Sequence, residues 1–123
     1  MSKILFTINA ILTLPFGIIA LFFPEAVFAG FGIVLNDGGQ LIARGYAATL
    51  IGFGLLFFLL RNESKSELIK PLLLSAVIFN SIEAIIQGIA GINSVALPVI
   101  WGTVVAHSIM AILCYAGMMK TKA

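Results

Sequence analysis

The chain has 123 residues, of which 61% are hydrophobic and only 10% are charged, and its mean hydropathy is +1.16. Soluble domains average about 45–50% apolar and about 25% charged residues, and disordered chains have low hydrophobicity, so both classes are excluded. The net charge of +2 is small and its basic residues are dispersed, so no nucleic-acid partner is indicated. The composition is that of a polytopic membrane protein whose first partner is the lipid bilayer.

Four apolar runs are long enough to cross a bilayer, which takes about 20 residues of helix. They cover roughly residues 4–23, 40–60, 71–91 and 98–119. We therefore predict an all-α fold, a transmembrane four-helix antiparallel bundle that forms a single domain over residues 1–123. Residues 24–35 are too apolar for a solvent loop, and Pro24 can open a short helix. This segment is predicted to lie at the outer interface or to cap the outer end of the bundle.

Turn and capping residues mark the ends of these spans. Asp37, in an Asn-Asp-Gly-Gly turn, is a candidate N-cap of the second span. Ser64 and Glu67 have the spacing of a capping box before the third span. Pro98 fits the first turn of the fourth span.

Basic residues indicate the orientation of the chain. All six that flank the spans fall on one side of the four-span arrangement: Lys3, Arg61, Lys65, Lys70, Lys120 and Lys122. The positive-inside rule places that side, with both termini, in the cytoplasm. We expect the membrane to be a bacterial inner membrane. The alternative, a signal peptide cleaved between Ala29 and Gly30, is less favoured because the first apolar run exceeds a typical signal-peptide core.

Three ionisable residues fall inside the spans: Arg44, Glu83 and His107. A charge at mid-bilayer costs about 2.5–3.5 kcal/mol on insertion scales, so such groups are kept when they are paired or useful. Counted along the helices, they lie about 7, 12 and 13 Å below the outer ends of their spans. This common depth predicts an ion pair between Arg44 and Glu83, with His107 beside it as a hydrogen-bond partner.

Other polar residues share helical faces with these three. Asn80 and Gln87 lie on the face of Glu83 in the third span, and Thr103 lies on the face of His107 in the fourth. One interpretation is a ligand-binding pocket in the outer leaflet, lined by Arg44, Glu83, His107, Asn80, Gln87 and Thr103. The other is structural, because interhelical polar contacts hold helices together by about 0.6 kcal/mol each.

Small residues in the second span predict where helices approach closely. Gly45 with Thr49, and Ala48 with Gly52, have small-xxx-small spacing, and Gly54 lies nearby.

The same span resembles the second helix of DoxX-like proteins, small bacterial four-helix integral membrane proteins. The stretch from Leu41 to Leu56 has the arginine, the following glycine and the later Gly-x-Gly-Leu step of that helix, at Arg44, Gly45, Gly52 and Gly54. The Phe-Phe-Pro exit from the first span at residues 22–24 is similar too. The resemblance implies a four-helix bundle and carries no catalytic residue.

No motif in the chain specifies a reaction or a cofactor. There is no phosphate-binding glycine loop, nucleophile elbow or metalloprotease motif. With one cysteine and one histidine, Cys114 and His107, a single chain forms no disulfide and no zinc site of several such ligands. No metal is predicted, and the cofactors are unknown.

We interpret the chain as a non-enzymatic membrane protein that binds a small lipophilic molecule or serves as an accessory subunit, as a homo-oligomer or within a larger membrane complex. Three alternatives stay open. Glu83 and His107 are a possible acid–base pair for a lipid-soluble substrate. His107 is also a possible axial ligand in a pigment- or haem-binding subunit. A proton-coupled transporter is open as well, and four spans would then require a dimer.

Overall fold

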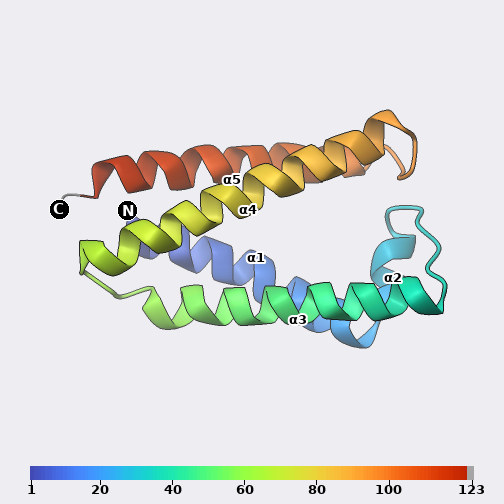
Figure 1. The fold of residues 1–123 in the computed structure, drawn as a ribbon, viewed down its shortest axis with the longest axis horizontal. Helices are drawn as coiled ribbons and strands as arrows, with labels where there is room; N and C mark the ends of the chain where they lie inside the picture. Colours follow the sequence, from blue (N-terminus) through green and yellow to red (C-terminus); the bar gives the residue numbers. More distant parts are fainter. Residues whose placement is uncertain (122–123) are drawn as a thin grey trace. The chain divides into compact units, whose positions relative to one another are not determined.

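The computed structural model describes residues 1–121, which include five helices and no strand (Figure 1). Four helices are long and apolar enough to cross a membrane: α1 (Ser2–Phe22), α3 (Asp37–Leu60), α4 (Ser66–Ile92) and α5 (Ile100–Lys120). The fifth, α2 (Pro24–Ala29), has six residues. The all-α class and the four predicted spans are confirmed, and the chain is a polytopic membrane protein. Lys122, used above for orientation, lies outside the described residues.

Contacts between residues divide the chain into two compact units. The N-terminal unit is Phe6–Arg61, which contains most of α1 together with α2 and α3. The C-terminal unit is α4 and α5 together with Met1–Leu5. Each unit thus pairs two spanning helices, while the single domain predicted over residues 1–123 stays a prediction.

In the N-terminal unit, α1 and α3 pack antiparallel and very closely. A Cβ added at Gly17 would lie 3.1 Å from Cβ of Leu50, and one added at Gly54 would lie 2.5 Å from Oγ1 of Thr13. Positions earlier in α1 therefore meet positions later in α3. At both crossings the absence of a side chain brings one helix against the other.

The glycines at this close approach differ from most of those predicted. The buried face of α3 consists of Ala43, Ala47, Leu50, Gly54 and Phe57. A Cβ added at Gly45 or Gly52 would meet no atom within 4 Å beyond its chain neighbours and the nearby backbone of α3, because both glycines lie on the exposed side of the helix. Of the predicted small residues, only Gly54 faces α1.

Helix α2 begins at Pro24 as predicted, with the proline in its first turn. The helix covers residues 24–29 of the expected segment 24–35 and is linked to α3, because the Gln40 side-chain amide donates a hydrogen bond to the Glu25 carboxylate. Its place at a membrane interface stays a prediction.

Two predicted helix starts were displaced by one or two residues. The N-cap of α3 is Asn36, whose side-chain oxygen accepts a hydrogen bond from the Gly39 amide at 2.7 Å, so Asp37 is the first residue inside the helix. An asparagine caps as well as an aspartate, which is why the sequence alone did not separate them. Helix α5 begins at Ile100, and Pro98 lies in the turn before it.

The predicted capping box before α4 does not form. The helix begins at Ser66, and its cap residue, Lys65, makes no capping bond through its side chain. Instead, the Glu63 carboxylate accepts the backbone amides of Ser64 and Lys65, each at 2.8 Å. These two hydrogen bonds, that of Lys65 foremost, lower the pKa of Glu63 in this loop.

In the C-terminal unit, α4 and α5 form an antiparallel pair (Figure 1). A Cβ added at Gly91 would lie 2.9 Å from the Trp101 ring, and one added at Gly117 would lie 3.6 Å from Leu73. The late part of α4 therefore meets the early part of α5, and the early part of α4 meets the late part of α5.

The start of α1 belongs to the same unit. A Cβ at Gly117 would lie 2.5 Å from a methyl group of Leu5, so the first turn of α1 packs where α5 ends. Lys3 is in that first turn, Lys70 is near the start of α4, and Lys120 ends α5. Three of the basic residues used to infer the orientation therefore lie at one end of this unit.

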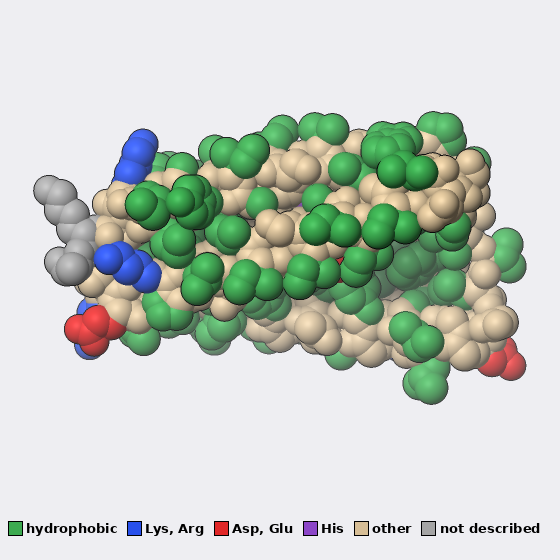
Figure 2. All heavy atoms as spheres, turned by 45° about the horizontal axis from the view of Figure 1, so that its top comes forward, with side chains coloured by type: hydrophobic (Ala, Val, Ile, Leu, Met, Phe, Trp, Pro, Cys, Tyr) green, Lys and Arg blue, Asp and Glu red, His purple; other side chains and the backbone are tan. Residues whose placement is uncertain are grey.

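The outward faces of the spanning helices are apolar. Only 22% of the span window in α4 and 17% of that in α5 are buried. Large side chains such as Ile85 and Ile112 are 61% and 67% exposed. Figure 2 shows hydrophobic side chains covering the helices along their length. Such a surface is unsuited to water and is matched by lipid chains.

Candidate functional site

The polar residues of α4 and α5 meet halfway along the pair. Asn80 is almost fully buried, with 3% of its surface exposed, and its Oδ1 lies 2.8 Å from Nδ1 of His107. The Asn80 side-chain amide group donates to the Ala76 carbonyl, one turn earlier in α4, at 2.8 Å. Asn80 therefore connects its own helix to α5 through a single side chain.

This arrangement determines which nitrogen of His107 carries the proton. Because the amide nitrogen of Asn80 faces the Ala76 carbonyl, its oxygen must be the atom that faces His107. An oxygen accepts, so Nδ1 of His107 is the donor. In the neutral imidazole, Nε2 then has no proton and presents a lone pair. The histidine is half-buried, and its ring makes an edge contact with Phe79 at a centroid distance of 6.1 Å.

Glu83 and Gln87 form a second polar pair one turn further along α4. The Gln87 amide group donates to Oε2 of Glu83 at 2.8 Å. This bond directs the other amide atom, Oε1 of Gln87, into the protein, where it is buried and accepts no hydrogen bond from the described residues. A buried acceptor without a donor costs about 1–3 kcal/mol, so this position is suited to a donor group from elsewhere.

Thr103 lies one turn before His107 on α5, and its place in the ligand site stays a prediction. Its hydroxyl donates to the Ile100 carbonyl at 2.6 Å, a bond within the first turn of α5. The hydroxyl oxygen can still accept a hydrogen bond, but its proton is used. Thr103 therefore stabilises the start of α5.

Arg44 belongs to the N-terminal unit, where it has a local partner. Its Nε donates to the Leu21 carbonyl at 3.3 Å. Leu21 lies in the last turn of α1, where carbonyl groups lack helical donors and carry partial negative charge. Arg44 thus caps the end of α1. Its predicted ion pair with Glu83 would link residues of different units, and that ion pair stays a prediction.

The structure therefore brings four of the six predicted residues together: Asn80, Glu83, Gln87 and His107. Within this group Glu83 and His107 have separate partners, Gln87 and Asn80, rather than one hydrogen bond between them. Sequence reasoning missed the Leu21 carbonyl as a partner of Arg44. Pro24 was a usable sign that α1 ends near residue 22 and that the carbonyls of its last turn need donors from elsewhere.

Comparisons of the chain with protein-family models, with curated proteins and with solved structures find no match in any of the three. The similarity of α3 to DoxX-like proteins is therefore not supported by a family match. The roles of the polar residues must be argued from their own contacts.

Proposed function

We propose that this membrane protein binds a small lipophilic molecule at the polar strip of its C-terminal unit, defined as Asn80, Glu83, Gln87 and His107, and that it is not an enzyme. The observation that carries the proposal is the hydrogen bond between Asn80 and His107. Through it a buried asparagine orients a half-buried histidine and leaves its second nitrogen available. An accessory subunit could use the same site to hold a ligand for a larger complex.

The chemistry of the strip selects for ligands that donate hydrogen bonds. Nε2 of His107 offers a lone pair, Glu83 offers a carboxyl oxygen, and Oε1 of Gln87 is a buried acceptor without a donor. These acceptors are distributed along about two turns of α4, from Asn80 to Gln87, and each is best satisfied by a hydroxyl or amine group. A phenol, a quinol or a sterol-like alcohol has such a group on an apolar body.

The surroundings of the strip favour access from the bilayer. Ile82 and Ile86, which flank Glu83 on α4, are 50% and 56% exposed. An apolar ligand dissolved among lipid chains reaches these side chains without crossing water. Its hydroxyl group then meets His107 in a medium of low dielectric, where a hydrogen bond is stronger than in water.

A matched pair of probes tests this proposal: a para-alkylphenol and its methyl ether, which differ by one hydroxyl proton. Binding is measured by isothermal titration calorimetry with the full-length protein in phosphatidylcholine nanodiscs. We expect the phenol to bind and the ether to bind at least about tenfold more weakly, because a site with unpaired acceptors rejects a ligand that lacks the donor. The variant His107→Phe should reduce phenol binding to the level of the ether.

Ser108→Ala is the matched control, because within the described residues the Ser108 hydroxyl bonds to the Val104 carbonyl of its own helix. It should bind the phenol as the wild type does. Equal binding of phenol and ether, or unchanged phenol binding by His107→Phe, would show that the strip only holds α4 and α5 together.

A second candidate function, an axial ligand role for His107, is favoured by the same hydrogen bond. Histidines that bind metals through Nε2 commonly donate Nδ1–H to an oxygen, as His107 does to Asn80. One histidine allows one such bond per chain. Visible absorbance of the protein purified from its native membrane, lost in His107→Phe, would support a haem or pigment subunit, and a spectrum without a visible band would remove this role.

The topology belongs to the same proposal. Lys3, Lys70 and Lys120 at one end of the C-terminal unit support the assignment of both termini to the cytoplasmic side of a bacterial inner membrane. The exposed apolar helix faces are compatible with a homo-oligomer or a larger complex. The DoxX-like resemblance contributes only the expectation of a four-helix bundle.

A further inference from the structure

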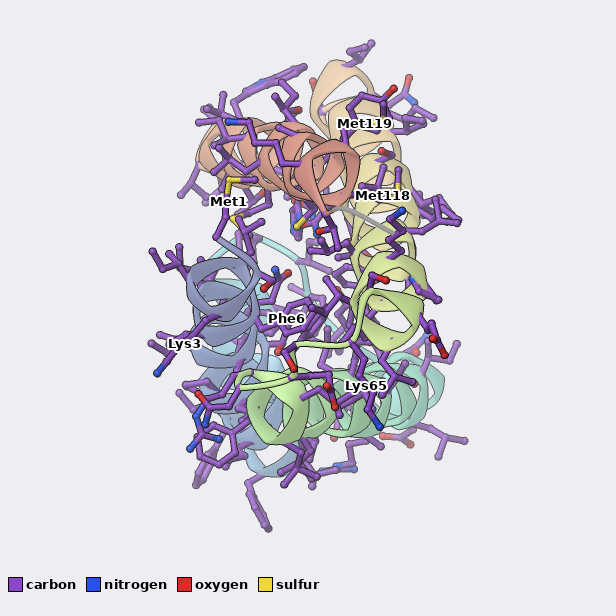
Figure 3. The ribbon with its side chains drawn as sticks, turned by 90° about the vertical axis from the view of Figure 1, so that its left-hand side faces the viewer. Met1, Lys3, Phe6, Lys65, Met118 and Met119 are labelled. Atoms are coloured by element: carbon purple, nitrogen blue, oxygen red, sulfur yellow. The ribbon has the colours of Figure 1, made fainter. Side chains whose placement is uncertain are left out.

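A groove lies between the start of α4 and the end of α5, far along the pair from the polar strip. Its volume is about 480 Å³, and it is open on one side. Its lining residues are Lys70, Pro71, Leu74, Met118, Met119 and Thr121. Figure 3 looks onto this end of the chain and shows Met118 and Met119 where α5 terminates.

The lining combines one cation with an apolar floor. Lys70 is half-buried and supplies the only charged side chain among the lining residues that the structure describes. The Thr121 hydroxyl already donates to the Gly117 carbonyl at 2.9 Å, so it contributes no free proton. Leu74 and the two methionines provide flexible apolar surface below the ammonium group. This order, cation above and hydrocarbon below, matches a lipid headgroup above its acyl chains.

The length of α4 places Lys70 near the membrane surface. Its 27 residues span about 40 Å, which exceeds the roughly 30 Å of bilayer hydrocarbon. The excess of about 10 Å, nearly two turns of helix, extends α4 into the headgroup region. Lys70 is the fifth residue of that helix, and the Lys120 that ends α5 is at the same end. Lipid phosphates are at this depth.

We propose that this groove binds an anionic phospholipid of the leaflet on the basic side, with its phosphate on Lys70 and an acyl chain along Leu74 and Met118. The apolar floor argues for a lipid rather than a free phosphate ion, which would gain nothing from that surface. The described lining has one cation, Lys70, and no acidic side chain, which favours an anionic rather than a zwitterionic headgroup. The bound lipid would join α4 to α5 at the end opposite their connecting loop.

The test uses the full-length protein in dodecyl maltoside micelles, titrated with phosphatidylglycerol. Native mass spectrometry reports the bound lipid. We expect Lys70→Gln to bind phosphatidylglycerol about fivefold more weakly, the change that corresponds to about 1 kcal/mol per basic residue at an anionic surface. Lys65→Gln removes the same charge from the same end of α4 but outside the lining, and it should bind as the wild type does.

A second pair of variants keeps every charge. Leu74→Trp places a large ring in the groove and should weaken binding to the extent that Lys70→Gln does. Ile78→Trp, one turn further along α4 and outside the lining, should have no effect. Because both tryptophans replace exposed residues, the two variants should unfold at similar temperatures.

Three results would overturn the proposal. Equal binding of phosphatidylcholine would show that the groove does not distinguish an anionic headgroup from a zwitterionic one. Equal losses of phosphatidylglycerol affinity in Lys65→Gln and Lys70→Gln would show that binding depends only on the general surface charge. Competition by inorganic phosphate that is as strong as that of the lipid would identify a free-anion site.

Discussion

A buried asparagine inside a membrane helix has few hydrogen-bond partners, and the two partners of Asn80 determine the tautomer of His107. Replacing Asn80 by Leu removes the acceptor that holds Nδ1–H of His107. We expect His107 to lose its fixed tautomer and the protein to lose about 1–3 kcal/mol of stability, the cost of leaving a buried polar group unpaired. Solid-state NMR of the imidazole nitrogens measures the tautomer, and denaturant unfolding in detergent measures the stability.

Ser108→Ala is again the control, since in the described part of the chain its hydroxyl bonds to its own helix. A fixed Nδ1–H tautomer that survived in Asn80→Leu would contradict the role given to Asn80.

The loop before α4 makes a prediction about pH. Its two amide hydrogen bonds lower the folded-state pKa of Glu63 below its unfolded value, so the stabilisation is complete above about pH 4.3 and is lost as the pH falls through the folded-state pKa. Glu63→Gln should therefore lose less stability between about pH 6 and pH 3 than the wild type does. Unfolding midpoints measured across that range check the difference, and parallel curves would contradict it.

Spacing alone predicted which polar residues of α4 share a face, because the helix repeat fixes that geometry. It could not predict their partners. The bond from Asn80 to Ala76 and the bond from Gln87 to Glu83 depend on side-chain rotamers, and the contact with His107 depends on how α4 and α5 cross. Partner choice among polar side chains is decided in three dimensions, so an ion pair proposed from depth alone could not allow for the Leu21 carbonyl as a partner of Arg44.

At the scale of helices, the contact between α1 and α3 depends on Gly54. A methyl group there would lie 2.5 Å from Oγ1 of Thr13 and 2.7 Å from Leu14, so Gly54→Ala must push the helices apart. We expect a loss of about 1–3 kcal/mol, the usual cost of overpacking. Thermal unfolding in detergent measures it.

Gly52→Ala is the matched control two residues away, because its Cβ would meet open space. It should be neutral or stabilising by up to about 1 kcal/mol, since alanine is the better helix former. If Gly54→Ala were as stable as Gly52→Ala, the close packing of α1 on α3 would be wrong.

The existence of the spans was predictable, while their ends and contacts were less so. Hydropathy detects a stretch of 20 apolar residues whatever surrounds it, and α1, α3, α4 and α5 follow that signal. A helix cap depends on a single side chain. The sequence therefore predicted Asp37 as the N-cap of α3, whereas Asn36, an equally good cap, is the one observed. Packing glycines could not be separated from lipid-facing ones, because Gly52 and Gly54 differ only in which side of α3 they occupy.

For the whole molecule, the threading of the chain makes a direct prediction. In a Cys114→Ser background, single cysteines at Val34 and Val95 should react with a membrane-impermeant maleimide on intact bacterial cells, since both are exposed in loops on the outer side of the proposed topology. A cysteine at Ser64 should react only after the cells are opened. Labelling of Ser64 and Val95 from the same side would contradict the span between them, α4.

The function proposed for the molecule depends on an imidazole nitrogen that is free to accept a hydrogen bond. The most direct measurement is the solid-state NMR signal of His107 Nε2 in lipid bilayers, recorded with the alkylphenol and with its methyl ether. Binding at the polar strip predicts that the phenol shifts this signal in proportion to its occupancy and that the ether leaves it unchanged. An Nε2 signal that already carries a proton without any probe, or that the saturating phenol does not move, would contradict the account.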